Sequence, residues 1–152
     1  MATRCYEAAH CAFDGARIFL NSVYSATKQF EPILAAAELE SDWPSLRAEL
    51  YFTIDEFDKR SADVRNFENQ LDGNFKTIRK DELYTILTRV YRQMPYESAN
   101  AIRLKETAEW HMDLSPEVRD ALIGYGDVLN QALADLNESL QSCITLLEKE
   151  GD

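Results

Sequence analysis

One short segment near the start of the chain combines residue types that could do chemistry. Glu7, His10 and Cys11 stand within five residues of one another. The Glu-x-x-His spacing is the one that helical bundles use to hold carboxylate-bridged metal ions, and the thiol of Cys11 stands beside it. This segment suggests one class of function, a helical-bundle metal-binding protein or enzyme that uses these three side chains.

The helix that carries this segment is expected to turn these side chains outward. Apolar residues recur at alternating steps of three and four across residues 4 to 38, which is the pattern of a helix that packs along one stripe. At about 100° per residue, Glu7, His10 and Cys11 fall opposite that stripe. Metal-binding Glu-x-x-His pairs instead project into a bundle core and need a second such pair, and His111 has no glutamate three residues before it. We therefore interpret the segment as a solvated helix face and expect no metal, cofactor or catalytic residue.

The remaining apolar residues also follow helical spacing, and no long segment alternates as a strand would. Glycines and prolines are few, at five and four, and most of them fall at breaks in the pattern. The sequence predicts helices at about residues 4–38, 41–71, 80–94 and 96–112, and from 116 to the C-terminus. Three of these would be near 30 residues, or roughly 45 Å long at 1.5 Å per residue. We therefore predict an all-α, elongated up-and-down bundle of four to five helices, formed by residues 1–152 as one domain.

Two of the apolar stripes are particularly regular. The second helix is expected to bury Leu46, Leu50, Thr53, Phe57, Val64, Phe67 and Leu71. The last helix is expected to bury Val118, Leu122, Tyr125, Leu129, Ala132, Leu136, Leu140, Cys143 and Leu147. These heptad-like stripes also permit self-association, so a homodimer is one expected form.

Local signals mark where the helices begin, bend or cross. Ser115 followed by Pro116 is typical of a helix start. Pro32 predicts a kink or a new start within the first helix. Gly124 and Gly126, inside the last helix, each cost about 1 kcal/mol relative to alanine, so they predict a close crossing, a kink or a break there.

The overall composition excludes several classes of function. The formal net charge of −11 disfavours direct binding to nucleic acid, which needs a basic surface. Three cysteines without repeated spacing favour neither a disulfide framework nor a structural zinc site. No stretch reaches the 18 apolar residues of a membrane span, and the first 20 residues lack an uninterrupted apolar segment. We expect a cytoplasmic protein that does not bind a membrane.

The charge is distributed unevenly along the chain. Residues 117–152 hold eight acidic and two basic residues, and residues 76–105 hold seven basic and three acidic residues. These two regions could pair within the fold. Alternatively, the acidic helix contacts a basic protein or imitates nucleic-acid phosphates.

These observations predict a small, acidic, non-enzymatic protein that binds a basic protein partner. An inhibitor, an immunity or anti-defence protein and a chaperone-like adaptor all have these properties. The expected contacts lie on the acidic faces of the second and last helices, with aromatic side chains outside the core stripes as anchors. The candidate partner-binding residues are Tyr51, Phe52, Asp55, Glu56, Asp58, Trp110, Asp120, Asp127, Asp135 and Glu138.

Overall fold

The computed structural model describes residues 4–40, 43–94, 99–110 and 114–149. Five helices account for nearly all of them, which confirms the predicted all-α fold. The three long helices have 35, 29 and 33 residues. The helices are α1 (Arg4–Glu38), α2 (Trp43–Leu71), α3 (Lys80–Gln93), α4 (Ala99–Trp110) and α5 (Pro116–Glu148).

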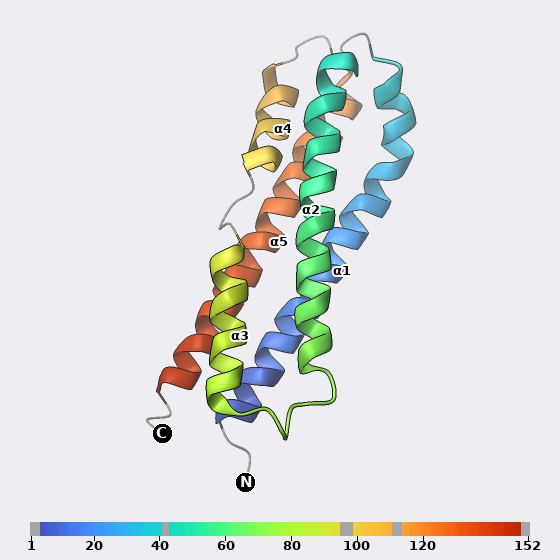
Figure 1. Cartoon of the computed structure of the whole chain (residues 1–152). Coiled ribbons are helices and arrows are strands. Elements are labelled where there is room, and N and C mark those ends of the chain that lie inside the picture. Colours follow the sequence, from blue (N-terminus) through green and yellow to red (C-terminus); the bar gives the residue numbers. More distant parts are fainter. Residues whose placement is uncertain (1–3, 41–42, 95–98, 111–113, 150–152) are drawn as a thin grey trace.

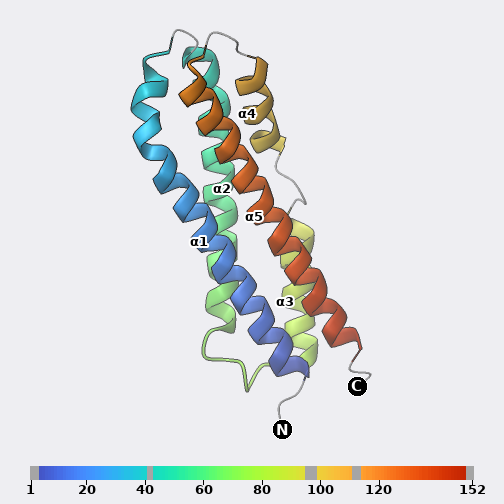
Figure 2. The ribbon, with the colours of Figure 1, turned by 180° about the vertical axis from the view of Figure 1, so that it is seen from behind.

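The helices form an elongated up-and-down bundle in which α3 and α4 together take the place of one long helix (Figure 1). These two short helices follow one another along the same side of the molecule. Helix α1 packs against α5 and α2, while α4 packs against both α5 and α2. Helices α2 and α5 are therefore diagonal to each other, and the view from behind shows α1 and α5 in front of α2 (Figure 2).

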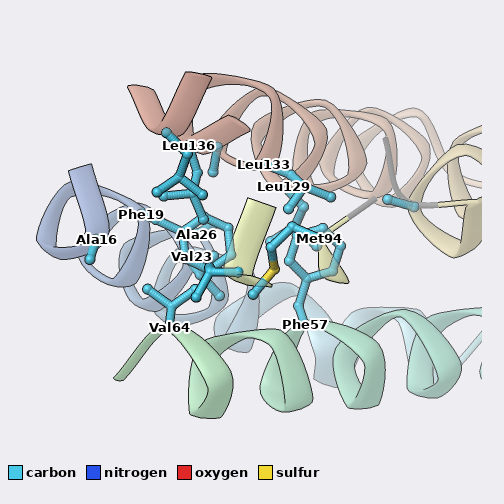
Figure 3. Packing of buried hydrophobic residues seen from close by; sticks show 14 of the residues in the cluster. Ala16, Phe19, Val23, Ala26, Phe57, Val64, Met94, Leu129, Leu133 and Leu136 are labelled. Carbon is cyan, nitrogen blue, oxygen red and sulfur yellow. The ribbon is translucent and has the colours of Figure 1, made fainter. Parts of the chain in front are cut away.

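The core runs along the whole bundle and draws side chains from every helix. Figure 3 shows Phe19 and Val23 of α1 facing Phe57 and Val64 of α2, with Leu133 of α5 above them. Every residue expected in the stripes of the second and last helices is buried. Cys5 and Cys143 are also buried, as small core residues.

The ends of the helices follow their local sequence. At the start of α5, the Ser115 side chain accepts a hydrogen bond from the backbone N–H of Val118 at 3.4 Å, and Pro116 is the first helical residue. Helix α2 ends at Leu71, two residues before Gly73, which has φ of +79°. A side chain is disfavoured in that left-handed region, so glycine suits the turn.

Pro32 does not end the first helix, because α1 continues through it to Glu38. Proline cannot donate a hydrogen bond to the carbonyl of Lys28, one turn earlier. Both residues are exposed, so water can satisfy that carbonyl. The packing of Phe30 against the ring of Tyr125, with centroids 4.9 Å apart, helps to hold this part of α1 against α5.

The two glycines of α5 have different roles. A Cβ atom on Gly126 would lie only 3.0 Å from the backbone oxygen of Ala101, so α4 and α5 cross closely at this point. A Cβ atom on Gly124 would meet nothing within 4 Å. Of the three readings of this pair, the close crossing is correct, and α5 continues without a break.

Two buried groups should make the fold sensitive to alkaline pH. Burial raises the pKa of Tyr125 above its ordinary value of 10.0, and burial also raises the pKa of Cys143 above its ordinary value of 9.0. The unfolded chain therefore loses both protons at lower pH than the folded protein does. The free energy of unfolding should be independent of these groups below about pH 8 and fall as the pH rises through 9 to 11.

Urea unfolding between pH 8 and pH 11, with a reductant present, measures this dependence. The free energy of unfolding of Cys143→Ala, and that of Tyr125→Phe, should each fall less steeply with pH than that of the wild-type protein. If the free energy of unfolding had the same slope against pH in the wild-type protein and in both variants, the pH dependence would not come from Tyr125 and Cys143.

None of the helices in the described part of the chain contains an apolar segment long enough to cross a membrane.

Candidate interaction surface

The three side chains of the N-terminal segment do not share one environment. Glu7 and Cys11 are exposed, but His10 is half-buried because the loop between α2 and α3 covers it. The His10 ring stacks on Phe75 with centroids 4.1 Å apart and planes 11° apart, and Tyr6 packs against its edge at 4.6 Å. The expectation of a solvated face is therefore wrong for His10, which helps to fix the loop.

Cys11 also has a contact that its place on the helix did not predict. Its thiol lies near the thiol of Cys143 in α5, close enough to contribute to the raised pKa of Cys143. No set of three or more His, Cys, Asp or Glu side chains could hold a metal ion among the residues that the structure describes. His111 lies outside the described residues.

The acidic residues of the last helix lie on its outward side. Asp120, Asp127, Asp135 and Glu138 are all exposed. Asp127 pairs with Lys105 of α4 at 2.8 Å. Asp135 accepts a hydrogen bond from Gln131 at 2.8 Å. Two of these four carboxylates, Asp127 and Asp135, therefore have polar partners within the protein.

The uneven charge of the sequence is thus partly paired inside the fold. The Lys105–Asp127 pair joins the basic region to the acidic helix, and the hydrogen bond to Asp127 raises the pKa of Lys105. Arg103 instead reaches α2, where it pairs with Glu49 at 3.0 Å. Exposed pairs of this kind contribute little to stability, so their main effect is to reduce the negative potential beside α4.

The two acidic faces expected to bind a partner point to different sides of the molecule. Helices α2 and α5 are diagonal in the bundle, so the outward side of one faces away from the outward side of the other (Figures 1 and 2). A compact partner could contact one of these faces but not both. The structure therefore separates Asp55 and Asp58 on α2 from the acidic residues on α5.

The outward side of α2 carries an apolar hollow of about 420 Å³. Phe52 is 64% exposed and Tyr51 is 42% exposed, although both are large apolar rings. The ring of Tyr51 is held edge-on by Trp43 at 6.2 Å, and the Arg47 guanidinium lies 5.7 Å from its centroid. The hollow is lined by Pro44, Arg47, Ala48, Tyr51, Phe52 and Asp55, and we call these six residues the α2 surface.

The carboxylates near the α2 surface differ in how far they are engaged. Asp55 pairs with Lys59 on the same helix at 3.1 Å, and Asp58 is exposed. Glu56 faces α4 and accepts a hydrogen bond from the Asn100 side chain at 3.2 Å. Glu56 thus has a role within the fold, whereas Asp55 and Asp58 are exposed, and Asp55 lines the hollow beside the aromatic rings.

Trp110 is 82% exposed and is the last residue of α4. The end of α4 and the start of α2 lie at the same end of the bundle (Figure 1). Trp110 does not line the hollow, so the structure does not join it to Tyr51 and Phe52.

Sequence reasoning missed Pro44, Ala48 and Arg47 as parts of this surface. The sequence does contain a signal for Pro44 and Ala48. Together with Tyr51 and Asp55 they recur at steps of four, three and four, on the side of α2 opposite its core stripe. Leu39 was missed as well. It is 88% exposed and follows the end of α1, where no periodic pattern could single it out.

Comparison with protein family models, with curated proteins and with solved structures found no match to this chain.

Proposed function

We propose that this protein is a non-enzymatic binding module whose α2 surface docks a basic protein partner. The observation that carries the proposal is the exposed pair of Tyr51 and Phe52 over an apolar hollow, beside the exposed carboxylate of Asp55. Grouped exposed apolar side chains with a polar rim are typical of interaction sites. Inhibition, immunity, anti-defence activity and a chaperone-like adaptor role all work through contacts of this type.

The rigidity of the α2 surface supports the proposal. Both rings stand on a helix of 29 residues whose opposite side is buried in the bundle core. Trp43 and Arg47 restrict the Tyr51 ring further. An aromatic anchor that is already ordered loses little conformational freedom on binding, so more of the contact energy contributes to affinity.

The charge of the protein supports a basic partner. The chain has a formal net charge of −11, Asp55 lines the hollow with the aromatic rings, and Asp58 is exposed further along the same helix. Such a field attracts a positively charged surface and speeds the encounter, and salt weakens both effects. The apolar hollow would then supply the part of the affinity that salt does not remove.

The test compares two exposed aromatic residues on different helices. Phe52 and Tyr24 of α1 are both 64% exposed, so truncating either should have little effect on folding. Tagged wild-type protein, Phe52→Ala and Tyr24→Ala are used to capture partners from lysate of the source cells at about 0.05 M and about 0.5 M salt. Captured proteins are identified by mass spectrometry, and their affinities are measured with purified components.

We expect a basic partner that the wild-type protein and Tyr24→Ala retain at low salt and lose at high salt. Phe52→Ala should bind this partner at least tenfold more weakly, a loss of about 1.4 kcal/mol or more. Equal affinity for Phe52→Ala and the wild-type protein would reject the α2 surface. A partner with an acidic surface, or none in lysates from several growth conditions, would reject the proposed function.

A further inference from the structure

Helices α1 and α5 run antiparallel and approach each other very closely near Gly15. A Cβ atom on Gly15 would lie 3.1 Å from the Cβ of Ser139. Ala8 and Ala12 are completely buried in the same part of α1. Small side chains therefore let the two backbones approach along this stretch.

Two cysteines face each other one helical turn from this close approach. Cys11 precedes Gly15 by four residues, and Cys143 follows Ser139 by four residues. Because the helices are antiparallel, both steps lead in the same direction along the bundle. The two thiols are near enough there for Cys11 to contribute to the raised pKa of Cys143.

This arrangement is compatible with a disulfide bond. A disulfide joins Cβ atoms that are about 3.5–4.5 Å apart. A Cβ atom placed on the neighbouring Gly15 would lie 3.1 Å from the Cβ of Ser139, so the two backbones are close enough on this stretch for facing Cβ atoms to come within such a distance. Small adjustments of the two side chains, without movement of the helices, should be enough to join the sulfur atoms.

We propose that Cys11 and Cys143 form an oxidation site that reacts with low-molecular-weight disulfides and links α1 covalently to α5. In the first step, the Cys11 thiolate attacks one sulfur of oxidised glutathione. A mixed disulfide forms on Cys11, and one glutathione leaves as a thiolate. In the second step, the Cys143 sulfur attacks the Cys11 sulfur, the second glutathione leaves as a thiolate, and the proton of Cys143 passes to that thiolate. Two protein thiols are oxidised, and one glutathione disulfide is reduced to two thiols.

The different exposure of the two thiols determines their order of reaction. Cys11 is exposed and can meet a dissolved disulfide, whereas Cys143 is completely buried and can react only with its neighbour. Burial also raises the pKa of Cys143, so the second step should be the slower one and should speed up as the pH rises. The third cysteine is not part of this pair, because the Cys5 thiol donates to the backbone oxygen of Ile78 at 3.6 Å.

The link would stabilise the folded protein without altering the α2 surface. It would close a loop that contains most of the chain, and long loops lose the most freedom in the unfolded state when they are cross-linked. The inference does not depend on the proposed partner, since the α2 surface belongs to a different helix.

The experiment treats the full chain with oxidised glutathione at pH 8 and follows it by intact mass and by peptide mapping without reductant. We expect the loss of two hydrogens, a peptide that joins Cys11 to Cys143, and a higher thermal unfolding midpoint that a reductant reverses. Cys5→Ser should behave like the wild-type protein. Cys11→Ser should form no link, and Cys143→Ala should stop at a glutathione adduct on Cys11.

The peptide map of the wild-type protein shows whether the Cys11–Cys143 link forms, even if the Cys143 variant folds poorly. A stable glutathione adduct on Cys11 without the internal link would overturn the proposal. Disulfide-linked dimers through Cys11, or a link that includes Cys5, would overturn it as well.

Discussion

Replacing Phe57 by alanine should lower the free energy of unfolding by about 3–5 kcal/mol. Phe57 of α2 is only 1% exposed, and its ring points into the centre of the bundle near residues of α1 and α5 (Figure 3). Alanine would remove most of the apolar contacts of this ring and leave a cavity that neighbouring long helices cannot readily fill. Urea unfolding monitored by circular dichroism measures the change.

Phe52→Ala is the matched control for this prediction. Phe52 lies on the same helix, but it points outward and is 64% exposed. Truncating it removes little buried area, so the free energy of unfolding should change by less than about 0.5 kcal/mol. A loss of more than about 1 kcal/mol for Phe52→Ala would show that this ring supports the fold instead of being available to a partner.

Replacing Gly126 by leucine should destabilise the protein by about 1–3 kcal/mol or more. The first carbon of any side chain would already lie 3.0 Å from the backbone oxygen of Ala101. A backbone atom cannot rotate out of the way as a flexible side chain can, so α4 would have to move away from α5. Hydrogen exchange should then show reduced protection in α4, including its buried residues Leu104 and Ala108.

Gly124→Leu provides the comparison within the same helix turn. Gly124 is exposed, and a Cβ atom there meets nothing within 4 Å. Leucine should therefore raise the free energy of unfolding by up to about 1 kcal/mol through its better helix propensity. Similar changes for the two variants would argue against a close crossing of α4 and α5 at Gly126.

The candidate site could be predicted from the sequence only in part. The sequence predicts Phe52 as an anchor because it falls outside the core stripe of α2, and Asp55 as a contact because it belongs to the acidic face of that helix; both line the hollow. Glu56 was selected on the same ground, but it contacts Asn100 of α4. The periodicity of one helix shows which side faces the core, but it does not show how far neighbouring helices extend around that side.

The sequence by itself determined the helices, their core stripes and several of their ends. Spacing of three and four places Leu46 and Leu129 in the core, and Ser115 with Pro116 begins α5. These features depend on helix geometry and on hydrogen bonds between residues close in the chain. Such interactions can therefore be recognised in a single sequence.

The tertiary structure alone decided which separate segments meet. It placed α2 diagonal to α5, the loop residue Phe75 over His10, Cys11 against Cys143, and Gly126 against Ala101. Each of these contacts joins residues that are distant in the chain. Their geometry depends on how all the helices pack at once, because every helix must bury its stripe against neighbours that compete for the same space.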